Sequence, residues 1–296
     1  MSMRMVNLAL GLLLLATATA AAPLVFHADT PVARNLARDF SEVWQEHGAA
    51  LMADLLPAGA IVDTIHCLVL PSDSFKQYFG DRLPDWGVGV AMPPGKLVAV
   101  DYEQISTVGP GPATVFVHEM THALLFQGAG EARLPTWLHE GAAMRASGEW
   151  RFTDTVAVAL SGHVPSLGSL DGPFPRGGAG AQTAYRTSLA AVTYLESEHG
   201  PGAVPRIVAS ARRHGDFYRG FLTATGEEPS MFAHRFAARM RLRYGWVLLL
   251  FRWPTFFVIL AVLFSVGAIR KIIITRRSLH DPDEPDDPHE SGSFPS

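Results

Sequence analysis

Apolar and polar residues change their spacing along this chain, and each spacing predicts a different element. Between residues 34 and 56 the large apolar residues recur at helical intervals, which predicts one or two amphipathic helices. Residues 62–70 are rich in β-branched and aliphatic side chains and stop at a Pro-Ser-Asp sequence, which predicts a strand followed by a short capped helix. Residues 86–92 and 97–100 flank a Pro-Pro-Gly turn and predict a β-hairpin.

Helical spacing dominates from Pro112 onward, apart from a Gly- and Pro-rich stretch at residues 162–180 that predicts a loop. The order is therefore a few strands first and many helices afterwards. We expect an α+β fold, in which a small N-terminal β-sheet with its helices packs on a mostly helical C-terminal part.

Two strongly apolar runs stand near the ends of the chain. Residues 1–22 contain Arg4, then an apolar stretch and a run of small residues, which is the order of a secretory signal peptide. Whether this signal is removed or stays as an anchor is open at this point. Residues 247–269 are long and apolar enough for one C-terminal transmembrane helix. A buried core helix is the alternative, but the tail that follows offers nothing to pack against.

The predicted signal also sets the expected topology. Because the first hydrophobic element dominates orientation, residues 23–245 should form an extracytoplasmic domain and residues 270–296 a cytoplasmic tail. From Ser278 the tail holds six acidic residues and four Pro but no Lys or Arg, so we expect disorder there. The 21 Arg against 3 Lys indicate a GC-rich bacterial genome, and hence a periplasmic position or the outer face of a bacterial inner membrane.

Composition limits the chemistry that is available. The 296 residues carry a net charge of −4, which gives no overall basic field for nucleic acid. The single cysteine, Cys67, cannot form an internal disulfide or a CxxC site, and its place in a predicted strand indicates an inert buried thiol. Chemistry must therefore come from imidazole, carboxylate or hydroxyl groups. The oligomeric state is not readable from the sequence.

An HExxH motif, His118 to His122, lies in the helix predicted to run from Pro112 to near Gly128. Its two imidazoles are four residues apart, so they project from the same helix face and can bind one zinc ion. Glu119 lies about 100° further round the helix, where it can hold a water without being a ligand. The alternative is structural: the two histidines and Glu119 merely hydrogen-bond to one another.

A catalytic zinc site needs a third protein ligand and an open position for water. Glu140 follows His122 with seventeen residues between them. Thr136 is expected to cap a second helix that brings this carboxylate to the metal. His139 should point about 100° away from Glu140, so we interpret it as a capping or hydrogen-bonding residue rather than a ligand.

HExxH followed at this distance by Trp-Leu-His-Glu-Gly-Ala-Ala, residues 137–143, resembles the gluzincin metallopeptidases, and in particular the peptidase MA-like domains of bacterial proteins. The resemblance implies a zinc peptidase fold that holds one zinc ion. It implies that His118, His122 and Glu140 are the metal ligands and that Glu119 is the general base. It also implies a catalytic Tyr185 that donates a hydrogen bond to the developing oxyanion. A Tyr185 that only packs is the alternative, and Tyr194 is then the second candidate.

These features favour a membrane-anchored, extracytoplasmic zinc metallopeptidase that hydrolyses peptide bonds in a peptide or protein substrate. Two alternatives stay open: a catalytically silent binding module of the same fold, and a zinc amidase that acts on cell-wall material. The substrate could add as a strand along residues 87–92, because Gly87 and Gly89 let another backbone approach closely. The 162–180 loop could instead cover the cleft.

Overall fold

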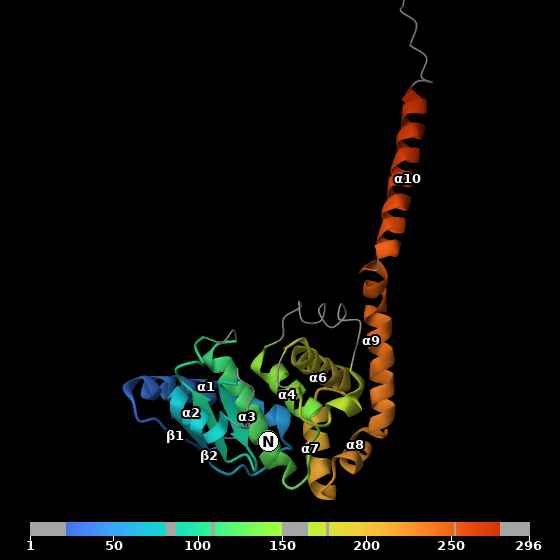
Figure 1. Cartoon of the computed structure of the whole chain (residues 1–296). Coiled ribbons are helices and arrows are strands. Elements are labelled where there is room, and N and C mark those ends of the chain that lie inside the picture. The colour runs from blue at the N-terminus through green and yellow to red at the C-terminus, as the bar shows by residue number, and fades with distance from the viewer. Residues whose placement is uncertain are drawn as a thin grey trace, which may run out of the picture. The chain divides into compact units, whose positions relative to one another are not determined.

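The computed structural model describes residues 22–80, 87–107, 110–149, 165–175, 178–251 and 253–278 (Figure 1). The chain divides into two compact units, with the boundary between Leu242 and Arg243. The predicted signal peptide, apart from Ala22, lies outside the described residues, and so do the tail after Ser278 and residues 162–164 and 176–177 of the predicted 162–180 loop.

A four-stranded mixed sheet forms the N-terminal layer of the first unit. Its strands are β1 (Leu24–His27), β2 (Ile65–Leu70), β3 (Gly89–Met92) and β4 (Leu97–Asp101), in the spatial order β1-β2-β4-β3. The β1–β2 and β2–β4 pairs are parallel, whereas β3 and β4 form the predicted antiparallel hairpin. The sequence pattern does not predict β1, because its apolar residues continue the uncharged N-terminal run.

Helices cover both faces of the sheet. On one face, α2 (Ser72–Phe79) packs Phe75 and Phe79 against Ala99 of β4. On the other face lie α1 (Pro31–Leu55), which is one helix of 25 residues, and α3 (Pro112–Ala129). The rings of Phe40 and Phe116 stack between α1 and α3 with centroids 4.5 Å apart. The helix that carries the HExxH motif is therefore packed against both the sheet and α1.

The second half of this unit is helical, as the sequence predicts. It contains α4 (Thr136–Ser147), the short 3₁₀ helix η2 (Leu167–Leu170), α6 (Gly178–His199), α7 (Ala203–His214), α8 (Phe217–Thr225) and the first part of α9 (Pro229–Phe251). The α4 and α6 helices pack so closely that a Cβ atom at Gly141 would collide with the backbone oxygen of Ser188. The expected α+β fold, with a small N-terminal sheet and a mostly helical C-terminal part, is confirmed.

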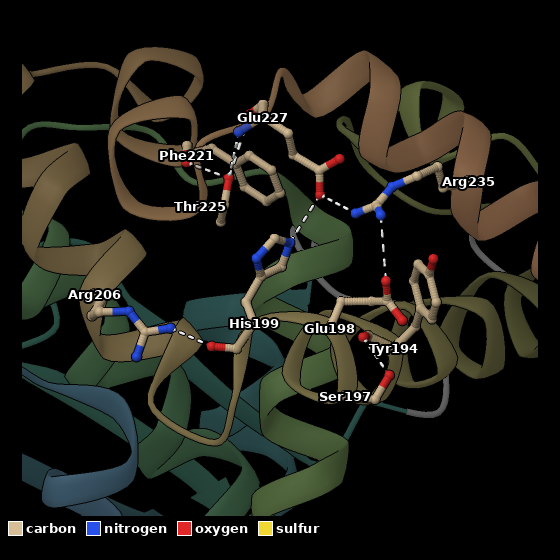
Figure 2. Close-up of polar contacts among 9 residues, drawn as sticks. All are labelled: Tyr194, Ser197, Glu198, His199, Arg206, Phe221, Thr225, Glu227 and Arg235. Carbon is tan, nitrogen blue, oxygen red and sulfur yellow. Dashed lines mark hydrogen bonds and ion pairs between the residues drawn. The ribbon is translucent and has the colours of Figure 1, made fainter.

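A charged cluster joins the end of α6 to the start of α9, as Figure 2 shows. The Oε1 atom of Glu227 accepts hydrogen bonds from Arg235 (2.6 Å) and His199 (2.8 Å). Arg235 also pairs with Glu198 at 3.3 Å. Glu227 and His199 are each less than one-fifth exposed, so these contacts are largely buried and hold the start of α9 on the end of α6.

The second unit contains α10 (Trp253–Ser278), which carries the C-terminal apolar run. Its residues Phe256–Arg276 form a helix that is long and apolar enough to cross a membrane, and none of that stretch is buried by protein. The span therefore begins nine residues later than the 247–269 segment expected from the sequence. The described residues 247–251 belong to α9 instead.

Candidate metal centre

The polar residues of the HExxH motif stand in a helix that is buried almost all round. Helix α3 starts with Pro112 at its first turn and is followed by Gly130, whose φ of 63° ends it. Most of its side chains, including Glu119, are buried. Charged and imidazole groups in such a helix need specific partners, since burial without them costs free energy.

The structure brings His118, His122 and Glu140 together. Helix α3 presents the two imidazoles, with ring centroids 4.8 Å apart, and α4 presents the carboxylate. The Oε2 atom of Glu140 lies 3.4 Å from Nε2 of His118 and 3.6 Å from Nε2 of His122. The three side chains are 15%, 12% and 17% exposed, in the order His118, His122, Glu140, so they meet in a largely dry site.

These separations suit ligands of a metal ion better than hydrogen-bond partners. An N–H···O hydrogen bond spans about 2.7–3.2 Å, whereas two ligands of a tetrahedral zinc ion at about 2.0–2.2 Å lie about 3.3–3.6 Å apart. The Oε2 atom of Glu140 is buried and, among the described residues, has no hydrogen-bond partner. A cation bound between the three side chains would satisfy this atom, so the group could hold a metal ion.

The charges of the group are strongly coupled. Burial favours the neutral acid form of Glu140, but the imidazoles of His122 and His118 outweigh it and hold the pKa of Glu140 well below its usual range. Burial also favours neutral His118, but the carboxylates of Glu140 and Glu149 raise the pKa of His118 well above its usual range. The carboxylate is therefore ionised and ready to bind a cation, which would compete with the proton on His118.

Glu119 lies beside the cluster and faces strand β3. A Cβ atom placed on Gly89 would be 2.8 Å from Oε1 of Glu119, so the strand backbone passes directly over this carboxylate. Burial raises the pKa of Glu119, although the charges of His122 and His118 act in the opposite direction. A carboxylate with a raised pKa is a better proton acceptor near neutral pH than an ordinary surface glutamate.

Of the two tyrosines considered from the sequence, the structure couples Tyr185 to the cluster. Burial raises the pKa of Tyr185, and the negative charges of Glu140, Glu119 and Glu149 raise it further. Its ring packs edge-on against Phe174 at 5.2 Å. Tyr194 lies elsewhere: it packs on two phenylalanines of α9 and stands beside the charged cluster of Figure 2. Tyr194 is therefore a poor second candidate for the oxyanion donor.

Sequence reasoning misses Glu149. This residue follows the last turn of α4, and its Oε1 atom lies 2.7 Å from Nδ1 of His118. The hydroxyl of Ser147 donates a hydrogen bond to the same oxygen at 3.0 Å. No motif spacing marks Glu149, because it reaches His118 only through the turn at Gly148. That glycine at the end of a helical pattern is the one signal that could have drawn attention to the carboxylate after it.

One expectation about α4 is wrong. The N-cap residue is Pro135, not Thr136, whose hydroxyl instead donates to the backbone oxygen of Asp171 at 3.3 Å. The Nδ1 atom of His139 is buried and has no hydrogen-bond partner among the residues that the structure describes. Burial and nearby His122 lower the pKa of His139 to about 3, which keeps the ring neutral beside the site. Its ring packs 4.6 Å from that of Phe126.

Comparison with known proteins adds no relative. No protein-family model matches the chain, and no curated protein matches it at a significant level. The resemblance to gluzincins accordingly rests on the two sequence motifs at residues 118–122 and 137–143 alone.

Proposed function

We propose that the chain is a zinc-dependent metallopeptidase that hydrolyses peptide bonds and is anchored to a membrane by α10. One observation carries the proposal: two Nε2 atoms on α3 and one carboxylate oxygen on α4 converge at the separations of metal ligands, next to a buried glutamate. Two histidines and one glutamate are a common ligand set of catalytic zinc, and they leave a position open.

His118, His122 and Glu140 would hold the ion. A zinc ion bound by such a set lowers the pKa of a water towards 7 and polarises a carbonyl group. Glu119 takes the proton of the attacking water on its carboxylate and then gives it to the leaving amine. Tyr185 keeps its proton because its pKa is raised, so its hydroxyl can donate a hydrogen bond to the developing oxyanion.

The substrate would bind as an added strand along β3, whose outer side is not paired with any strand among the described residues. The backbone oxygen of Val88 accepts a hydrogen bond from Asp101 of the neighbouring strand region. Because backbone groups alternate in antiparallel pairs, Gly89 and Ala91 point their N–H and C=O groups outward. A peptide paired with Gly89 and Ala91 would lie next to Glu119, which favours an extended peptide as the substrate.

Replacing Ala91 by proline tests this binding mode. The change removes an outward N–H group that the β3–β4 hairpin does not use. We expect KM for a peptide substrate to rise several-fold while zinc content stays constant. Ala91→Ser keeps the N–H group and serves as the control. An unchanged KM in Ala91→Pro would remove β3 as the substrate strand.

The proposed location follows from the ends of the chain. The predicted signal at residues 1–22 would place the catalytic unit outside the cytoplasm, on the outer face of a bacterial inner membrane, with residues after the span inside. Protease accessibility of the catalytic unit in spheroplasts tests this orientation. Digestion only after the membrane is broken would reverse the assignment.

Zinc quantification and cleavage assays on the same preparations test the chemistry. The wild type should hold one zinc ion per chain and cleave peptides. Glu119→Gln should retain zinc but lose turnover by about 10²–10⁴-fold, because a general base is removed. Glu140→Gln should lose zinc. A chain without zinc would favour the silent binding module, and a zinc-loaded chain that cleaves cell-wall fragments but no peptide would favour the amidase.

A further inference from the structure

The end of α4 is a left-handed glycine turn. Gly148 has φ 71° and ψ 21°, and its N–H group donates to the backbone oxygen of Met144. The N–H group of Glu149 donates to the same oxygen at 3.2 Å, so the chain folds back at the helix end. A Cβ atom at Gly148 would have no neighbour within 4 Å, so the backbone conformation and not lack of space favours glycine here.

This turn places the Glu149 carboxylate against the back of His118. The distance from Oε1 to Nδ1 is 2.7 Å, and the Glu149 side chain is only 22% exposed. The Ser147 hydroxyl holds the same oxygen from the last turn of α4. The side chain of Glu149 thus has two fixed contacts and little room to reorient.

A carboxylate at Nδ1 determines which face of the imidazole can bind a metal. The carboxylate only accepts hydrogen bonds, so Nδ1 of His118 must carry the proton. A cation that displaces the other proton of the ring would then bind at Nε2, the atom that lies 3.4 Å from the Oε2 atom of Glu140. Without Glu149 a neutral ring could place its proton on Nε2, and this tautomer cannot bind a cation there.

Glu140 lies in α4, and Glu149 follows directly after the end of that helix. That segment is held on α6 by the close approach at Gly141 and by the ion pair between Arg145 and Glu196, whose Nε and Oε2 atoms are 2.6 Å apart. This rigid part of the chain therefore carries both Glu140, a candidate ligand, and Glu149, whose carboxylate contacts the candidate ligand His118. Because these side chains are already held in place, less conformational entropy would be lost when a metal ion binds.

We propose that Glu149 is a positioning residue that fixes the tautomer and ring orientation of His118 for metal binding, and that the Gly148 turn places it there. This inference rests on the proposed function, because it assumes that His118 binds zinc.

Zinc affinity is the first readout, measured by competition with a chromophoric chelator on the full-length protein in detergent. Glu149→Gln, which preserves size but not charge, should weaken zinc binding by about 10–100-fold. Glu149→Asp should recover part of the loss. Glu131→Gln removes one exposed negative charge elsewhere and should leave zinc affinity unchanged.

The tautomer is the second readout and needs no metal. In zinc-free protein with ¹⁵N-labelled histidine, at a pH high enough for a neutral ring, His118 of the wild type should show a proton on Nδ1 and none on Nε2. In Glu149→Gln the Nε2–H form should appear, because the amide can also donate. His118→Asn identifies the signal. A purely structural role of Glu149 would not change this pattern.

The glycine turn is tested with matched variants. Gly148, Gly215 and Gly226 all end helices in the left-handed conformation with open space around the Cβ position. Alanine at each should lower the unfolding midpoint to a similar extent. Only Gly148→Ala should also weaken zinc binding. Equal zinc affinity in Gly148→Ala and Gly215→Ala would exclude the turn as the element that places Glu149.

The outcomes separate this inference from the proposed function. If the wild type binds zinc and Glu149→Gln binds it equally well with an unchanged His118 tautomer, the inference is wrong and the metal site stands. If the wild type binds no zinc, the proposed function fails, and the role assigned to Glu149 in metal binding fails with it.

Discussion

Gly89 lies where strand β3 passes closest to Glu119, and its missing side chain leaves room for that carboxylate. An added Cβ atom would stand 2.8 Å from both Cγ and Oε1 of Glu119, closer than real Cβ contacts. Because Glu119 is buried, its carboxylate would have to move from its present position to make room for the added Cβ atom. A proton acceptor that is displaced by about 1 Å can slow a reaction about 100-fold.

We therefore expect Gly89→Ala to lower kcat for peptide cleavage by about 10–100-fold while zinc content stays at the wild-type level. Steady-state kinetics and metal quantification on the same sample measure both effects. Gly80→Ala is the control, since its added Cβ would make an ordinary 3.7 Å contact with Lys76. A Gly89→Ala enzyme with unchanged kcat would show that Glu119 tolerates displacement.

Cys67 gives a prediction about reactivity at the same scale. The thiol is fully buried on β2, and burial together with nearby Glu119 raises the pKa of Cys67 far above its usual range. A thiol that stays protonated at pH 7–9 and is shielded from solvent reacts slowly. We expect no reaction of the native protein with a thiol reagent over an hour at pH 8, and one equivalent after unfolding. Rapid labelling of the native protein would contradict the buried position of Cys67.

At the scale of elements, the contact between α4 and α6 positions Glu140. Gly141 comes directly after this residue, and a Cβ atom there would collide with the backbone oxygen of Ser188 and with Val192. Backbone cannot move aside as a flexible side chain can, so the two helices would have to separate. That separation would also shift the Glu140 carboxylate away from His118 and His122.

Gly141→Ala should destabilise the fold by about 1–3 kcal/mol, as overpacking does, and should weaken zinc binding as well. Denaturant unfolding and chelator competition measure the two effects. Gly220→Ala creates a similar collision, with the backbone of Ala211 between α8 and α7, but far from Glu140 in the chain. It should reduce stability without a change in zinc affinity. Equal zinc loss in both variants would point to general destabilisation.

At the scale of the whole molecule, the two units contain different structural features. The unit that ends at Leu242 contains the sheet, the candidate metal centre and the charged cluster of Figure 2. Within it, α9 packs Phe232, Phe236 and Met240 into the core. The apolar surface of α10 is exposed along the whole candidate span, as expected of a helix that faces lipid.

A chain that stops after Leu242 should therefore be recovered from the soluble fraction with one zinc ion per chain, whereas the full-length protein should require detergent. Size-exclusion chromatography and zinc quantification measure this difference. The helix contacts of Arg235 are retained in the shorter chain, so α9 should stay folded. Aggregation of the shorter chain would mean that residues 243–296 contribute to folding of the first unit.

Features that depend on near neighbours can be predicted from the order of the residues alone. Helical spacing, the Pro-Pro-Gly hairpin and the four-residue separation of His118 and His122 are local, so residue types and intervals are enough to predict them. The position of Glu140 and the capping type of Thr136 extend the prediction to a second helix, and the family resemblance implies that Glu140 is a ligand.

Contacts between segments that are distant in the chain follow from the folded arrangement and not from local residue patterns. Strand β1 exists because residues 24–27 pair with β2 some forty positions later. The hydroxyl of Thr136 bonds to Asp171 instead of capping its helix. Glu149 reaches His118 across 31 positions through a glycine turn. Such contacts depend on how whole elements pack, and no local interval in the sequence encodes that distance.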